Sequence, residues 1–128
     1  MLFRSINFQL APGSSPVFSN ADFSVRSNFS TGWNILIRSQ AQQNMSIVQE
    51  SQSWVSFRYN EKQERPAFCF RINKANQTEN IQFATLVAPF NTTPPAIDFK
   101  LIKSSDPNKI QIEIDENGVK KLIECNIP

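Results

Sequence analysis

The sequence predicts an all-β protein, an antiparallel β-sandwich of about eight to ten short strands with little or no helix. Its apolar residues are mostly types that favour sheets, with 13 Ile and 11 Phe against 6 Leu. Apolar and polar residues alternate with a period of two in many short runs, and Pro, Gly, Asn and Ser clusters separate these runs about every ten residues. Two packed antiparallel sheets require this pattern.

The N-terminal half supplies the first strands. Residues 6–10 alternate before the turn 12–16, the pattern continues weakly through 17–25, and residues 33–38 alternate again with Trp33 on the apolar face. Short runs at 45–48 and 54–59 are also expected to be strands.

The C-terminal half predicts two hairpins. Residues 68–72 and 81–87 are expected to pair across a long polar loop. After a proline-rich break, residues 97–101 and 110–114 alternate, and Asn117-Gly118 predicts a tight turn into a return strand over 119–125. The predicted inward-facing residues are Ile6, Phe8, Leu10, Trp33, Ile35, Ile37, Phe68, Phe70, Ile72, Phe83, Ile97, Phe99, Ile110 and Ile112.

Length and composition limit the possible functions. The 128 residues suit a single domain over 1–128, and the net charge of +2 comes from scattered residues, so no nucleic-acid partner is predicted. No apolar run reaches the ~20 residues that span a bilayer, so no membrane partner is predicted. The chain has no His, which removes the commonest general base and metal ligand. We therefore expect no catalytic residue, metal or cofactor in this chain.

The two cysteines, Cys69 and Cys125, have no CxxC or Cys/His companion, so a zinc site is not predicted. Two free thiols in strands are expected, and a disulfide between the two residues is the alternative. Cys69 alternates with Phe68 and Phe70 and should face away from them.

One segment combines aromatic rings with cations and is the candidate binding site. Aromatic faces stack on sugar rings, and cations pair with carboxylate or sulfate, so this composition suits an acidic polysaccharide. The alternative is that Trp54 and Tyr59 fill the core while the cations form a solvated rim. The candidate substrate-binding residues are Trp54, Arg58, Tyr59, Lys62 and Arg65, with Arg71 nearby in the sequence.

The same segment carries a family resemblance. Residues 54–66 have the spacing W-x-S-x-x-Y-x-x-K-x-x-x-P, which resembles the C-terminal segment of the heparinase II/III-like polysaccharide lyases. The strand with Phe68 and Phe70 and the run 81–90, with Phe83, Thr85 and Pro89, resemble that family's later strands. Residues 8–13 are similar to the strand and turn that open the same β-region.

The resemblance implies a role within a larger enzyme. In this family a helical toroid stands N-terminal to a β-sandwich, and the enzymes cleave uronic-acid-containing polysaccharides by β-elimination, with a Tyr or His base. This chain has no His, and Tyr59 belongs to the sandwich signature, so the resemblance implies a non-catalytic C-terminal domain severed from its toroid. A periplasmic or secreted location would follow from the same resemblance.

Three functions remain open from the sequence. The domain could buttress the helical toroid and contact acidic glycan, act as an independent carbohydrate-binding module, or serve as a structural protein-interaction domain. An exposed aromatic patch would favour glycan binding, whereas an apolar patch bordered by polar residues would favour the buttress.

Overall fold

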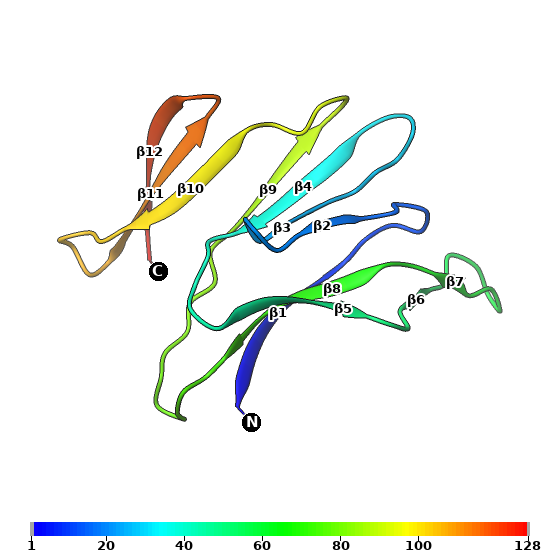
Figure 1. Ribbon diagram of the computed structural model, residues 1–128, viewed down its shortest axis with the longest axis horizontal. Coiled ribbons are helices and arrows are strands. Elements are labelled where there is room, and N and C mark those ends of the chain that lie inside the picture. Colours follow the sequence, from blue (N-terminus) through cyan, green and yellow to red (C-terminus); the bar gives the residue numbers. More distant parts are fainter. Residues whose placement is uncertain (1, 128) are drawn as a thin grey trace. The chain divides into compact units, whose positions relative to one another are not determined.

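The computed structural model describes residues 2–127 and contains strands but no helix in that range (Figure 1). The prediction of an all-β antiparallel fold is confirmed, with twelve short strands among the described residues. The chain divides into two units, the first ending at Thr92 and the second beginning at Thr93. Because no helix forms, none of the described residues belongs to a helix long and apolar enough to cross a membrane.

The first unit contains two main sheets and a short hairpin, all with antiparallel pairing. One sheet has the order β1-β8-β5, with β1 at Phe3–Gln9, β5 at Met45–Glu50 and β8 at Ala67–Asn73. The other has the order β2-β3-β4-β9, formed by Val17–Ser19, Ser24–Arg26, Asn34–Ser39 and Thr85–Phe90. The hairpin pairs β6 (Trp54–Val55) with β7 (Gln63–Glu64).

The core of this unit joins both sheets. Its buried members come from β3, β4, β8 and the residue that follows β1: Leu10, Val25, Ile37, Phe68 and Phe70. The Phe68 ring stacks on Phe8 with centroids 5.3 Å apart and meets Phe18 edge-on at 5.7 Å. Phe8 and Phe68 are cross-strand neighbours in one sheet, whereas Phe18 belongs to the other sheet. The contact between Phe68 and Phe18 therefore connects the two sheets, which makes the first unit a β-sandwich.

Most of the predicted inward residues are buried or partly buried, but two are not. Trp33 is 68% exposed, because it lies outside β4, which begins only at Asn34, and follows Gly32, whose φ of +82° is left-handed. The strand ladder therefore does not hold the indole on the apolar face. Ile110 is 38% exposed near the start of its strand, Lys109–Glu116, so its predicted burial is also wrong.

The predicted hairpin between residues 68–72 and 81–87 does not form. β8 pairs with β1 and β5, whereas β9 begins at Thr85 and pairs with β4 in the other sheet. Phe83 precedes that strand and is partly buried against the core. β9 is an edge strand, so Pro89 can lie within it although proline lacks a backbone donor.

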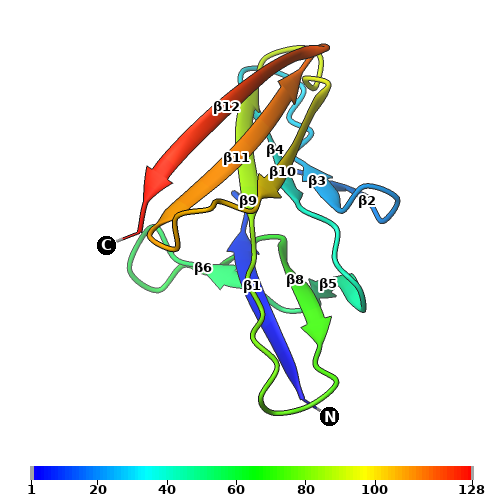
Figure 2. The ribbon, with the colours of Figure 1, turned by 90° about the vertical axis from the view of Figure 1, so that its left-hand side faces the viewer.

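The second unit is a three-stranded meander of β10 (Ile97–Ile102), β11 (Lys109–Glu116) and β12 (Val119–Asn126), which Figure 2 shows as consecutive arrows. The predicted Asn117-Gly118 turn is confirmed, with φ values of 53° and 83°. Both values lie in the left-handed region that a tight two-residue hairpin requires. The Gly118 amide also donates a hydrogen bond to Asp115 Oδ1 at 2.9 Å.

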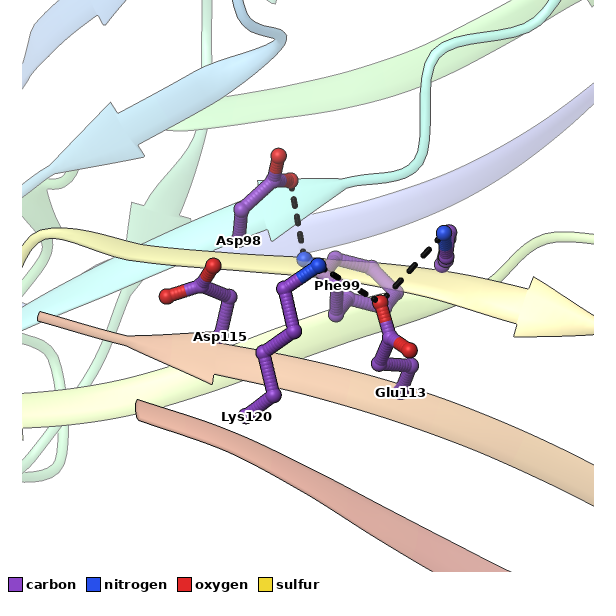
Figure 3. A pocket seen from close by; sticks show the side chains of 6 residues that line it. Asp98, Phe99, Glu113, Asp115 and Lys120 are labelled. Carbon is purple, nitrogen blue, oxygen red and sulfur yellow. Dashed lines mark hydrogen bonds and ion pairs between the residues drawn. The ribbon is translucent and has the colours of Figure 1, made fainter. Parts of the chain in front are cut away.

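One face of this meander is charged (Figure 3). Glu113 Oε1 lies 3.3 Å from Lys100 Nζ and 3.6 Å from Lys120 Nζ, so two strands supply cations to one carboxylate on the third. The other face of β10 carries Ile97 and Phe99, which are both buried. This alternation agrees with the predicted period of two.

Candidate functional site

The candidate binding residues lie mainly in one hairpin, residues 53–65, which we call the aromatic hairpin. Trp54 pairs with Glu64 and Val55 with Gln63, and these are the only ladder positions the structure gives to β6 and β7. The strand predicted over 54–59 is therefore limited to its first two residues. A turn replaces the rest, because Ser56 Oγ donates to the Arg58 carbonyl at 2.6 Å and the Glu61 amide donates to the same carbonyl at 3.2 Å.

The aromatic side chains of this hairpin are in solvent. Trp54 is 52% exposed, Phe57 71% and Tyr59 92%. The alternative in which Trp54 and Tyr59 fill the core is therefore wrong. Phe57 was not among the candidate residues, although its position three residues from Trp54 in the same segment could have indicated it.

The cations of the candidate site have two different settings. Arg58 and Lys62 are exposed in the hairpin loop, near the aromatic residues in the chain. Arg65 stands at the base, where its amide donates to the Ser53 carbonyl at 3.0 Å and its Nη2 donates to Gln9 Oε1. Arg65 thus links the hairpin to β1, while Arg58 and Lys62 are available to solvent.

Arg71 is separate from this group. It lies on β8, and its guanidinium carbon is 4.5 Å from the centre of the Phe3 ring, a cation–π arrangement. The structure therefore brings Trp54, Arg58, Tyr59 and Lys62 into one hairpin, with Arg65 at its base, and leaves Arg71 in the sheet.

A hollow of about 550 Å³ adjoins the base of the aromatic hairpin. Glu64, Arg65 and Pro66 line it from the hairpin side, and Glu50 lines it from β5. Its remaining lining residues are Gly13, Ser15, Pro16, Phe18 and Gln49. The charged residues of this lining are two carboxylates, Glu50 and Glu64, and Arg65.

The described residues contain no group of three or more Cys, Asp or Glu side chains that could hold a metal ion. Both thiols are free: Cys69 is buried and Cys125 is exposed. Burial raises the pKa of the Cys69 thiol above its ordinary value, despite the nearby charge of Arg71. The expectation of two free thiols is confirmed.

Comparison with known proteins gives the family context. No family model matches the chain. Heparin-sulfate lyase from Pedobacter heparinus is 30% identical over 122 residues, which are 92% of this chain and 18% of that protein. A crystal structure of a mutant heparan sulfate lyase HepC from the same organism superposes with a TM-score of 0.86 and 28% identity over 96% of this chain. The resemblance to the heparinase II/III-like lyases is confirmed.

The match to the heparinase II/III-like lyases extends to a further solved structure. A heparinase III gene product is 25% identical, with a TM-score of 0.81 over 96% of this chain and 19% of its own. This chain therefore spans only about a fifth of the length of the lyases that it matches. That coverage is consistent with a C-terminal domain of a larger heparinase II/III-like protein.

Proposed function

We propose that this chain is one non-catalytic domain, at the C-terminal side of a polysaccharide lyase that cleaves uronic-acid-containing polysaccharide by β-elimination. The matched lyases are about five times longer than this chain, which supports the assignment of catalysis to other parts of such an enzyme. The lack of His among the 128 residues supports it too, because the resemblance places catalytic His residues in these enzymes. The domain would buttress the helical toroid.

We further propose that the aromatic hairpin contacts the acidic glycan. The observation that carries this proposal is the exposure of Trp54, Phe57 and Tyr59 in the same hairpin as Arg58 and Lys62. Burial of three large rings would stabilise the fold, and their exposure gives up that stabilisation. Exposed apolar groups of this kind are typical of surfaces that bind a partner. Aromatic faces with adjacent cations suit a sugar ring that carries carboxylate or sulfate.

Retention on immobilised heparan sulfate tests glycan contact. The full chain should be retained at low ionic strength and released as salt rises, because exposed ion pairs are weak and screened. Chondroitin sulfate and a neutral dextran serve as comparison matrices. Failure to retain the chain on either sulfated matrix would leave only the buttress role or a protein-interaction role.

Incubation with the soluble polymers tests the non-catalytic role. We expect no release of unsaturated uronate from heparin, heparan sulfate, chondroitin or alginate. Ultraviolet absorbance measures this release. A protein-dependent rise that survives repurification would overturn this part of the proposal, whatever the retention experiment gives.

A further inference from the structure

The last strand, β12, forms an open edge of the second unit (Figure 2). It pairs with β11 alone, and all eight of its residues are exposed. Among the described residues it is the longest strand at the edge of a sheet, and it contains no proline. Such an edge presents a row of backbone amides and carbonyls to which another strand can add.

The hairpin determines which backbone groups of β12 lie on this open edge. Val119 is opposite Glu116 across the two-residue turn, and the residues that flank such a turn exchange both backbone hydrogen bonds. The odd-numbered residues of β12 therefore direct their amides and carbonyls toward β11. The Ile127 amide, which donates to the Asn108 carbonyl at 2.7 Å, has the same direction. The residues whose backbone groups face away from β11 are Lys120, Leu122, Glu124 and Asn126.

Charge limits the registers in which a second copy of β12 could occupy this edge. Two identical antiparallel strands are related by a two-fold axis, and their hydrogen-bonded residues are directly opposite each other. An even-numbered residue must then be opposite an even-numbered one, so the axis lies at a residue and not between two residues. An axis at Lys120, Lys121 or Glu124 would place like charges opposite each other, which is destabilising. An axis at Ile123 or Cys125 would pair no opposite charges.

An axis at Leu122 is the register that the charges favour. It places Lys120 opposite Glu124 of the second copy and, by symmetry, Glu124 opposite the second Lys120. Opposite charges directly across an antiparallel pair stabilise the pairing. Glu124 already accepts hydrogen bonds from Lys109 Nζ at 2.8 Å and from Gln111 Nε2 at 3.0 Å. Its carboxylate is therefore held on the face of the sheet where the second Lys120 would lie.

The apolar residues of β12 agree with the same register. Val119, Leu122 and Ile123 are 59%, 60% and 42% exposed. With the axis at Leu122, this side chain contacts its own copy between the two charge pairs. Ile123 is then opposite Lys121, whose aliphatic stem can cover it. Pairing would thus remove from water apolar surface that the single chain leaves exposed.

We propose that β12 pairs with β12 of a second copy of this chain, antiparallel and with the two-fold axis at Leu122, so that two three-stranded sheets become one continuous sheet. The proposal uses no residue of the aromatic hairpin, so its outcome is independent of glycan contact. An interface between two strands of this length is smaller than a standard protein interface, so we expect weak and reversible association with a dissociation constant of about 10–100 µM.

Sedimentation velocity of the full chain measures this association. The parent should be mainly monomer at about 1 µM and mainly dimer at about 500 µM. Leu122→Lys places like charges at the axis and removes the apolar contact, so it should raise the dissociation constant at least about tenfold. Val87→Lys, at a residue of the first unit that is 52% exposed, is the matched control and should change that constant less than about twofold. A parent that stays monomeric at the highest concentration, or equal weakening by both variants, would overturn the proposal.

Disulfide trapping tests the register. With the axis at Leu122, residue 119 is opposite Cys125 of the second copy in a pair without hydrogen bonds, where Cα atoms lie about 4.5 Å apart and a disulfide fits. Oxidised glutathione should therefore convert Val119→Cys into a covalent dimer on a non-reducing gel. Lys121→Cys is the control, because it would be opposite Cys125 only with the axis at Ile123. Trapping of Val119→Cys that is no faster than that of Lys121→Cys or of the parent would contradict the proposed pairing.

Discussion

Gln9 and Arg65 join the aromatic hairpin to the first strand: Arg65 Nη2 donates a hydrogen bond to Gln9 Oε1 across 56 positions of sequence. The Arg65 amide also donates to the Ser53 carbonyl, so both ends of the hairpin meet at this residue. The only ladder that the structure gives the hairpin consists of two residue pairs. This tether therefore has a large share in setting the position of a short hairpin that has little pairing of its own.

Gln9→Ala tests the tether. We expect faster amide hydrogen exchange at Val55 and Arg65, with a loss of only about 1 kcal/mol in the free energy of unfolding, because one exposed hydrogen bond is removed. Asn7→Ala, an exposed substitution on the same strand, is the control. Unchanged exchange in the hairpin would show that Gln9 does not restrain it.

The core assignment is tested by Phe70→Ala. The Phe70 side chain is fully buried between the sheets, so its truncation should cost about 3–5 kcal/mol in the free energy of unfolding. Phe57→Ala removes the same atoms from a ring that is 71% exposed and should change that free energy by less than about 0.5 kcal/mol. Denaturant titration measures both, and equal effects would contradict the assignment.

The buried amide network around Asn34 gives a third prediction. Asn34→Ala leaves the Ser27 hydroxyl and the Phe29 amide and carbonyl without their present partners, so it should cost about 2–4 kcal/mol in the free energy of unfolding. In a Trp54→Phe background the fluorescence anisotropy of Trp33 should also fall, because the loop that carries the indole loses its support. A variant with parent stability and unchanged anisotropy would exclude this role for Asn34.

Asp22 makes stability depend on pH. Burial raises the pKa of this carboxyl, but hydrogen bonds from Ser19 and Ser24 and the charge of Arg38 together outweigh burial and leave the pKa below its ordinary value of 3.8. A lowered folded-state pKa adds stability above the unfolded-state pKa, and that stability is lost as pH falls through the folded-state value. Asp22→Asn should therefore lower the melting temperature at pH 7, and the deficit should shrink below about pH 4. A deficit that does not change with pH would contradict the sign of this shift.

The two thiols should differ in reactivity. Cys125 is exposed, whereas burial disfavours the thiolate of Cys69 and blocks access to it. A thiol reagent such as DTNB should label one cysteine per native chain and both after unfolding, and Cys125→Ser should abolish the native-state labelling. Rapid labelling of Cys69 in the native Cys125→Ser variant would contradict its burial.

The sequence was sufficient for the features that depend on local patterns. The period of two placed Phe68, Phe70 and Ile72 in the core, and Asn117-Gly118 located a turn, because both signals act within a few residues. Strand pairing was not predictable in the same way. Thr85–Phe90 joins β4 instead of the preceding β8, because pairing depends on contacts between sheets that a local pattern does not contain.

The candidate site was predicted only in part, because the sequence does not show which aromatic side chains are exposed to solvent. Aromatic residues usually favour burial, so the sequence could not distinguish Trp54 in the core from Trp54 in solvent. Trp33 was assigned to the core because the alternation of Ile35 and Ile37 was extended back to residue 33. The strand begins only at Asn34, so the pattern does not apply to Trp33. No sequence signal indicated that the Ser14 hydroxyl would be buried without a hydrogen-bond partner, because the partners of a buried group depend on its three-dimensional neighbours.

The affinity of matched charge variants for heparan sulfate tests the central claim most directly. Arg58→Gln with Lys62→Gln removes two cations from the aromatic hairpin and spares Arg65, which anchors it. The control, Lys103→Gln with Lys121→Gln, removes two exposed cations of the second unit, so it has the same net charge as the hairpin variant. Isothermal titration at low salt should give about tenfold weaker binding for the hairpin variant and less than about twofold for the control. Equal weakening by both double variants would mean that only net charge attracts the glycan, and would contradict a binding site on the aromatic hairpin.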